Sequence, residues 1–145
     1  MKVRQVYRPQ AACVSPADSL RDAARKMRSS GQSCLPVLDG SSLTGIITER
    51  ALVEAAASGV PPSQVSVADY SHDGSVTVSL EDDCVSAELK MLAIGCRNLP
   101  VMDCGRLVGT VSMRDVRLKA AALATAANRR DGWPYEPDPG VDAES

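Results

Sequence analysis

An internal repeat constrains this chain more than any other feature. When the 145-residue sequence is shifted by 64 positions, its halves align without a gap, and 14 of the 40 residues from Cys13 to Leu52 are identical to their counterparts. The identities include the sequence Leu-Pro-Val at 35–37 and at 99–101. Such a repeat predicts two copies of one supersecondary unit that share a core, because neither copy alone buries both faces of its small sheet.

Each copy has the pattern β-α-β-β-α. In the first copy an extended segment at 11–15 leads to a helix that Ser19 caps, with apolar residues at i, i+3, i+4 and i+7, and Gly31 ends this helix. Two short strands and an alanine-rich helix follow. The expected elements after the first helix are strands Cys34–Leu38 and Leu43–Thr48 and helix Glu49–Ser58, then helix Asp83–Ile94, strands Asn98–Met102 and Leu107–Ser112, and a helix from Met113 to about Ala127.

The fold class is therefore α/β (α+β), with the two repeats packed around a pseudo-twofold axis. Pro36 and Pro100 lie inside strands, which favours edge or strand-start positions. We divide the chain into repeat 1, a linker, repeat 2, and a Pro-rich acidic C-terminal tail, at 3–59, 60–66, 67–127 and 128–145. We expect the tail to be mostly mobile, except for Trp133-Pro134-Tyr135, which could anchor it to the protein surface.

Composition excludes several functional classes. A net charge of −2 and an aromatic content of 3% argue against a nucleic-acid partner, which usually selects a basic field or stacking aromatics. No apolar run approaches the roughly 20 residues of a membrane helix. The five cysteines contain no C-x-x-C pair, so we expect reduced thiols and a cytoplasmic protein without a metal site. Only one histidine, His72, is present, and no phosphate-loop or dinucleotide fingerprint occurs.

The doubled unit resembles the cystathionine β-synthase (CBS) domain. The resemblance rests on the β-α-β-β-α order, the helix-ending glycine, the Leu-Pro-Val strand, and the run Gly-apolar-apolar-Ser/Thr-x-x-Asp, and it covers residues 3 to about 123. Two such domains in tandem are similar to a Bateman module. The resemblance implies a regulatory sensor without catalysis of its own, which requires no cofactor and binds AMP, ADP, ATP or S-adenosylmethionine in a cleft with two quasi-symmetric sites.

The second repeat carries the more complete ligand motif. Ser112 is the expected N-cap of a helix, where exposed N–H groups and the helix dipole favour a phosphate, and Arg114 can bind phosphate oxygens. The Asp115 carboxylate can accept hydrogen bonds from both hydroxyls of a ribose. The alternative is that Ser112 and Asp115 only cap the helix. The resemblance places the base beside Thr77, Val78, Leu99 and Pro100, although for Val78 and Leu99 ordinary core packing is the favoured alternative. Arg97 and Arg106 are further candidates for phosphate contacts.

The first repeat keeps Thr48 and Arg50 but has Ala51 where the second has Asp115. We therefore expect a weaker or empty second site. Its remaining members would be Val14, Leu35 and Pro36, for which core packing is again the alternative.

Two other functional classes stay open. In one, the repeat forms a non-catalytic dimeric interaction scaffold with a vestigial cleft, which Ala51 favours. In the other, the chain is an enzyme, but the sequence offers no nucleophile with a neighbouring base. For the partners we expect a second copy of the chain, an adenosine-containing small molecule and an unknown target protein, with no membrane. The homodimer is expected because the alanine-rich helices at 51–57 and 120–127 exceed what one module can cover.

Overall fold

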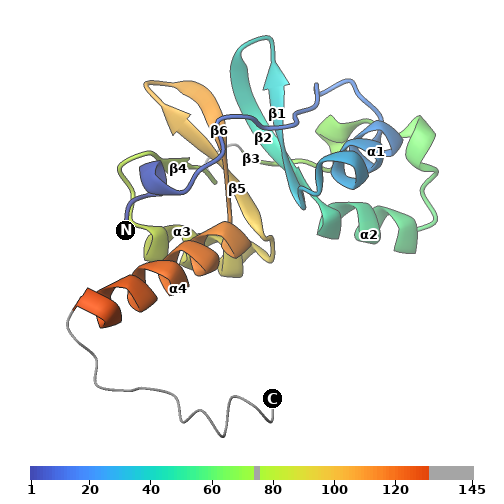
Figure 1. Cartoon of the computed structure of the whole chain (residues 1–145). Helices are drawn as coiled ribbons and strands as arrows, with labels where there is room; N and C mark the ends of the chain where they lie inside the picture. The colour runs from blue at the N-terminus through green and yellow to red at the C-terminus, as the bar shows by residue number, and fades with distance from the viewer. Residues whose placement is uncertain (74–75, 131–145) are drawn as a thin grey trace, which may run out of the picture.

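The computed structural model describes residues 1–73 and 76–130, and for Arg129 and Arg130 it describes the backbone alone (Figure 1). The tail anchor expected at Trp133–Tyr135 lies outside these residues. In chain order the helices and strands are α1 (Leu20–Ser30), β1 (Cys34–Asp39), β2 (Ser42–Thr48), α2 (Glu49–Ala57), β3 (His72–Asp73), β4 (Val78–Ser79), α3 (Cys84–Ile94), β5 (Asn98–Asp103), β6 (Arg106–Ser112) and α4 (Met113–Arg130). Short 3-10 helices lie at Val3–Gln5, Pro62–Gln64 and Val67–Asp69.

The two repeats form two quasi-equivalent halves. One three-stranded sheet has the order β1-β2-β3 and the other β4-β5-β6. The antiparallel hairpins have the same register, since Cys34 pairs with Thr48 and Asn98 with Ser112. Figure 1 shows α1 and α2 beside the first sheet, and α3 and α4 beside the second. The predicted α/β (α+β) repeat architecture is confirmed.

Local capping explains where the helices begin and end. The Ser19 hydroxyl accepts a hydrogen bond from the Asp22 N–H at 3.1 Å, and Gly31 closes α1 in the left-handed conformation at φ 73°. At the corresponding positions of the second repeat, Asp83 caps α3 and Gly95 ends it at φ 72°. The helix boundaries predicted from these residues are therefore confirmed, except that α4 continues to Arg130 instead of stopping near Ala127.

The leading segment of each repeat packs on the other repeat. Val3 is buried in the core of the second repeat, and its N–H donates to the Asp82 carbonyl at 2.9 Å. Its counterpart Val67 is buried in the core of the first, where its N–H donates to the Asp18 carbonyl at 2.7 Å. The boundaries at 3–59 and 67–127 thus divide the sequence, while in space the N-terminal segments are exchanged.

Two glycines permit this exchange. A Cβ on Gly109 would overlap the backbone carbonyl of Arg8, and one on Gly45 would overlap that of His72. The Arg8 N–H donates to the Thr110 carbonyl at 2.8 Å, and the Thr110 N–H donates back to the Arg8 carbonyl at 2.9 Å. The N-terminal segment therefore contacts β6 through a single antiparallel β-bridge, between Arg8 and Thr110.

Pro100 does not lie at the edge of the sheet or at the start of a strand, where the sequence predicted it. Pro36 is on β1, an outer strand of its three-stranded sheet, but Pro100 is on β5, the middle strand of the other. Proline is tolerated there because the residue opposite it is Thr110, whose N–H and carbonyl form their hydrogen bonds with Arg8 and not with Pro100. On the other side of β5, strand β4 begins at Val78, which pairs with Val101. No residue of a described strand is therefore paired there with Pro100, whose nitrogen carries no hydrogen to donate.

Candidate functional site

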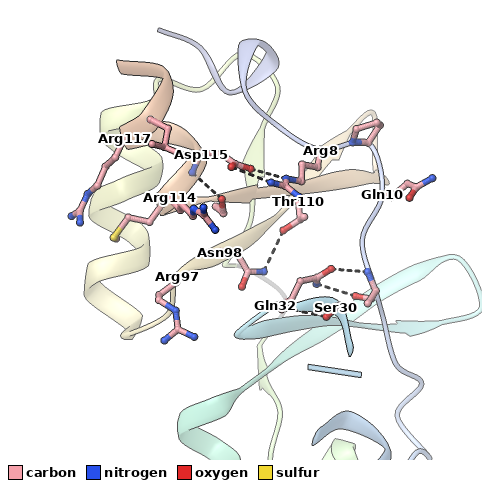
Figure 2. Close-up of a pocket in the computed structure, with 16 residues that line it drawn as sticks. Arg8, Gln10, Ser30, Gln32, Arg97, Asn98, Thr110, Arg114, Asp115 and Arg117 are labelled. Carbon is pink, nitrogen blue, oxygen red and sulfur yellow. Dashed lines mark hydrogen bonds and ion pairs between the residues drawn. The ribbon is translucent and has the colours of Figure 1, made fainter. Parts of the chain in front are cut away.

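A cavity of about 1140 Å³ opens at the start of α4 (Figure 2). Three parts of the chain line it: the N-terminal segment from Arg8 to Ala12, the end of α1 at 30–32, and the β6–α4 junction from Ser112 to Leu118. Arg97, Asn98 and Thr110 complete the wall. The cavity is therefore built by both repeats together, as the exchange of leading segments requires.

The β6–α4 junction brings together the three motif residues of the second repeat. The Ser112 hydroxyl accepts a hydrogen bond from the Asp115 N–H at 3.1 Å, which identifies Ser112 as the N-cap of α4. Ser112, Arg114 and Asp115 all line the cavity. Free N–H groups at a helix start, together with a guanidinium and a carboxylate, can bind a phosphate and a diol side by side.

Asp115 is already paired in this structure. Arg8 Nε donates to Asp115 Oδ2 at 2.7 Å and Arg8 Nη2 donates to Oδ1 at 3.2 Å (Figure 2). The Asp115 side chain is 17% exposed, whereas that of Arg8 is 70% exposed. The hydrogen bond from Arg8 is the main cause that lowers the pKa of Asp115, and partial burial opposes it. The same bond raises the pKa of Arg8.

The lining of the cavity is cationic although the chain is weakly acidic. Arg8, Arg97, Arg114 and Arg117 line it, and Asp115 is the only carboxylate among the lining residues, so four positive charges face one negative charge. Glu49 pairs with Arg97 at 3.3 Å and Glu88 pairs with Arg117 at 3.1 Å from outside the lining. Arg114 makes no hydrogen bond or ion pair with any residue in the described ranges, so its guanidinium is available to a ligand.

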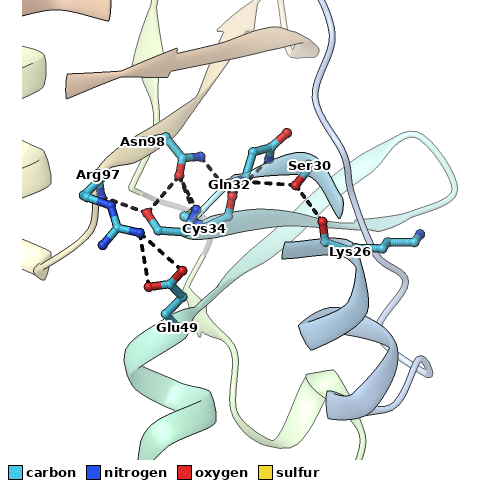
Figure 3. A network of polar contacts seen from close by, with 8 residues as sticks. Lys26, Ser30, Gln32, Cys34, Glu49, Arg97 and Asn98 are labelled. Carbon is cyan, nitrogen blue, oxygen red and sulfur yellow. Dashed lines mark hydrogen bonds and ion pairs between the residues drawn. The ribbon is translucent and has the colours of Figure 1, made fainter. Parts of the chain in front are cut away.

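A buried polar network forms the floor of the cavity and joins the repeats (Figure 3). Asn98 Oδ1 accepts from the Ser33 N–H at 2.8 Å and from the Cys34 N–H at 3.0 Å. Asn98 Nδ2 donates to the Cys34 carbonyl at 2.9 Å and to the Thr110 hydroxyl at 3.2 Å. Gln32 ties the N-terminal segment to α1, because its amide both accepts from the Ala12 N–H and donates to the Ala12 carbonyl.

The remaining residues predicted for the second repeat do not line this cavity. Val78, Leu99 and Pro100 are buried, and Thr77, which is partly buried, accepts a bond from Lys90 through its carbonyl. These positions follow from the β4–β5 ladder, whose inward side chains form the core. Arg106, at the start of β6, is exposed and likewise lies away from the cavity.

Most of the corresponding residues of the first repeat are buried. Val14, Leu35 and Pro36 are core residues, and Thr48 caps α2 by accepting from the Ala51 N–H at 3.2 Å. Ala51 is itself buried, so an aspartate there would place a carboxylate inside the core. Arg50 lies against Gly95, since its Nη1 is 3.5 Å from where a Cβ would stand. The large cavity therefore lies at the motif of the second repeat, which ends in Asp115.

The sequence analysis did not single out Arg8, which lines the cavity and pairs with Asp115. It lies outside the repeated motif and is 107 residues from its partner Asp115. The quasi-equivalent position in the other repeat is His72, which pairs with Ile46 on β2 as Arg8 pairs with Thr110 on β6, and the first repeat has Ala51 where the second has Asp115. Only the exchanged path of the N-terminal segment brings Arg8 to the site.

Comparison with known proteins assigns the family. The CBS domain model matches residues 3–58 and 67–121, so this chain belongs to the CBS domain family as a tandem pair. It is 36% identical over 104 residues to inosine-5'-monophosphate dehydrogenase from Korarchaeum cryptofilum, a match that covers 71% of this chain and 21% of that protein. The chain therefore spans about a fifth of the length of this relative.

Solved structures show the same fold. A protein from Burkholderia ambifaria, ascribed to signal transduction and containing CBS domains, superposes with a TM-score of 0.74 at 23% identity, over 83% of this chain and 91% of that one. The CBS domain pair of protein MJ0100, in complex with 5'-methylthioadenosine and S-adenosyl-L-methionine, has a TM-score of 0.69 at 21% identity, over 84% and 98% of the two chains. In the described part of this chain, no helix combines the length and apolarity needed to cross a bilayer.

Proposed function

We propose that this chain is a cytoplasmic regulatory module that binds one adenosine-containing ligand in the cavity at the start of α4 and signals to a partner protein. The single observation that carries the proposal is the placement of Asp115, a nearly covered carboxylate, in a cavity that is otherwise lined by arginines. The complex of protein MJ0100 with two adenosine compounds supports the ligand class. No catalytic role is proposed, and the ligand acts as a regulator and not as a required cofactor.

Each lining group has a separate task in this proposal. The two ribose hydroxyls donate to the Asp115 carboxylate, and the phosphates bind at the Ser112 cap and to Arg114. The adenine base is left with the apolar part of the lining, which includes Pro9, Ala12 and Met113. The base contacts expected from Thr77, Val78, Leu99 and Pro100 rest on the family resemblance, and none of the four residues lines this cavity.

Binding also offers a route for a signal. The ribose and Arg8 compete for the same carboxylate, so a ligand must displace the Arg8 guanidinium. Arg8 belongs to the segment that bridges to β6 and continues into the buried Val3. Ligand binding would therefore loosen or reorient the N-terminal segment, and a partner protein could detect that change.

A second candidate function is a dimeric interaction scaffold with a vestigial cleft. The observation that favours it is that Arg8 already neutralises Asp115, so the cleft is complete without a ligand. We propose that the chain is a homodimer under either function. The alanine argument for the dimer is weakened on α2, because Ala51 and Ala55 are buried within the chain's own core.

The two candidates differ in a thermal-shift experiment. AMP, ADP, ATP and S-adenosylmethionine would each be added to the purified chain, with GTP as the control for the base. A ligand at a hundred times its dissociation constant stabilises the fold by about 2.7 kcal/mol, which for a domain of this size raises the melting temperature by several degrees. A rise with an adenosine compound and not with GTP supports the sensor. No rise with any of them, and no adenosine compound released from the purified protein in a mass spectrum, contradicts it.

A further inference from the structure

Two cysteines from different repeats meet at the boundary between the two halves. Cys34 is the first residue of β1 and Cys96 lies just before β5, yet both side chains are buried in the core of the second repeat. The Cys34 and Cys96 thiols form a hydrogen bond with each other. The Cys96 thiol also donates to the Asn98 carbonyl at 3.2 Å. Both cysteines are free, so they form a dithiol that crosses the boundary between the repeats.

The pseudo-twofold relation of the repeats explains why these two side chains converge. The 64-residue shift aligns Cys34 with Asn98, and it also aligns Gln32 with Cys96. On one side of the axis, the side-chain amides of Asn98 and Gln32 both donate to the Cys34 carbonyl, at 2.9 and 3.2 Å (Figure 3). On the other side, quasi-equivalence directs the Cys34 and Cys96 thiols to the Asn98 carbonyl. Amides fill the equivalent positions, so packing alone does not select two thiols here.

Their surroundings give the two thiols different roles. The hydrogen bond from Cys34 is the main cause that lowers the pKa of Cys96, and the positive charge of Arg97 acts in the same direction, although burial opposes both. The same hydrogen bond, followed by burial, raises the pKa of Cys34. Cys96 is 5% exposed and Cys34 is 0% exposed. Cys96 is therefore the thiol that ionises and meets an oxidant first, and Cys34 is the resolving thiol beside it.

We propose that Cys34 and Cys96 are an oxidation site at which a hydroperoxide forms a reversible disulfide between the two repeats. The Cys96 thiolate attacks the peroxide and becomes a sulfenic acid, and the leaving oxygen takes up the proton that Cys96 released. The sulfur of Cys34 then attacks the sulfur of Cys96, so that the S–S bond forms and the sulfenic oxygen leaves as water with the proton of Cys34. Overall the two thiols lose two electrons and two protons, and the hydroperoxide is reduced to an alcohol and water.

The disulfide would fix the floor of the cavity. Cys34 already belongs to the buried network there, because its N–H and its carbonyl are both bonded to the Asn98 side chain. Arg97, which follows Cys96 in the chain, lines the cavity and pairs with Glu49. A bond between Cys34 and Cys96 therefore joins the repeats covalently beside the cavity. It should also stabilise the folded chain, because it restricts the unfolded state.

Digestion with trypsin reports the bond directly. Trypsin cleaves after lysine and arginine, so it places Cys34 in peptide 29–50 and Cys96 in peptide 91–97, and neither peptide contains another cysteine. The purified, ligand-free chain would be treated with equimolar hydrogen peroxide, its remaining thiols blocked, and the product digested without reductant. We expect a linked pair of these two peptides in the mass spectrum, and dithiothreitol should separate them.

Alanine variants supply the matched controls, with circular dichroism to check their folding. Cys34→Ala and Cys96→Ala should each abolish the linked pair, while Cys84→Ala, which removes another buried thiol of the same core, should keep it. Oxidation should raise the melting temperature of the wild type and of Cys84→Ala by roughly 10 °C. It should not raise that of Cys34→Ala or Cys96→Ala.

A linked pair that forms in the folded wild type, together with this rise in melting temperature, supports the proposal. A linked pair that forms only in urea, or none at all while the exposed Cys104 is oxidised, overturns it. A linked pair without any rise in melting temperature also contradicts it, because the bond would then have formed outside the native core. None of these measurements involves the adenosine ligand, so they are independent of the thermal-shift experiment.

Discussion

At the scale of single residues, the site depends on one carboxylate and on the guanidinium that covers it. Ser112, Arg114 and Asp115 could be predicted together because a contiguous motif places all three in the first turn of one helix. Arg8 could not, because no local pattern records that a segment 107 residues away crosses to this position. The main cause of the lowered pKa of Asp115 is therefore a residue that the sequence motif does not contain.

Replacing Arg8 should raise the pKa of Asp115. In Arg8→Gln the largest cause of the lowered pKa is removed, so the pKa returns towards that of an ordinary aspartate. Because the folded-state pKa is lowered, the ion pair contributes stability above the ordinary aspartate pKa and loses it as the pH falls through the lowered value. In the variant the ion pair is absent, so most of this pH-dependent contribution to stability should disappear. Carbon-13 NMR of the Asp115 carboxyl during an acid titration measures this pKa directly.

Arg4→Gln is the matched control for this titration, since Arg4 lies on the same segment but pairs with Glu81. It should leave the titration of Asp115 unchanged. An Asp115 pKa that is the same in Arg8→Gln and in the wild type would show that the ion pair does not form in solution.

A second residue, Asn98, should contribute strongly to stability. Asn98→Ala leaves the Ser33 N–H and the Cys34 N–H without their hydrogen-bond partner in a buried position, while the Cys34 carbonyl keeps the bond from Gln32. Each unsatisfied buried group costs about 1–3 kcal/mol, so we expect the free energy of unfolding to fall by about 3 kcal/mol. Urea denaturation of the ligand-free protein measures it. Asn128→Ala, on the exposed side of α4, should change it by less than about 0.5 kcal/mol. Equal effects of the two substitutions would contradict the role of the network.

At the scale of elements, capping residues and periodicity were enough to predict the helices and the two hairpins. Ser19 and Asp83 begin helices, and Gly31 and Gly95 end them, where the sequence indicated. The exchange of the leading segments was not predictable, because β3 and the bridge at Arg8 are too short to carry a periodic signal. Their pairing is decided by tertiary packing. The sequence feature associated with it is the glycine in the second strand of each hairpin, Gly45 on β2 and Gly109 on β6.

Gly109→Ala should detach the N-terminal segment from β6. The added methyl would overlap the Arg8 carbonyl, which is backbone and has little room to move. We expect the amides of Arg8 and Thr110 to lose protection in hydrogen exchange, because their reciprocal bonds at 2.8 and 2.9 Å would break. Ser42→Ala, at an exposed position on β2, is the control and should preserve the protection. Protection that survives in Gly109→Ala would mean that the segment tolerates a side chain there.

At the scale of the whole molecule, the two halves have nearly the same fold but differ in the side chains at equivalent positions. The two halves share their registers and caps, yet Asp115 corresponds to a buried Ala51, and the cavity lies at the second motif. The second repeat therefore holds the proposed ligand motif, while the first supplies the segments at 8–12 and 30–32 that complete the cavity.

The most direct measurement of this account is calorimetric titration of the chain with the adenosine ligand that the thermal-shift experiment selects. We predict one ligand per chain. Asp115→Ala should weaken binding at least tenfold, since hydrogen bonds to a charged group contribute about 1.5–3 kcal/mol each, while the protein stays folded. Arg50→Ala, in the equivalent motif of the first repeat, should bind like the wild type. Two equivalent sites in the wild type, or unchanged affinity in Asp115→Ala, would contradict the central claim.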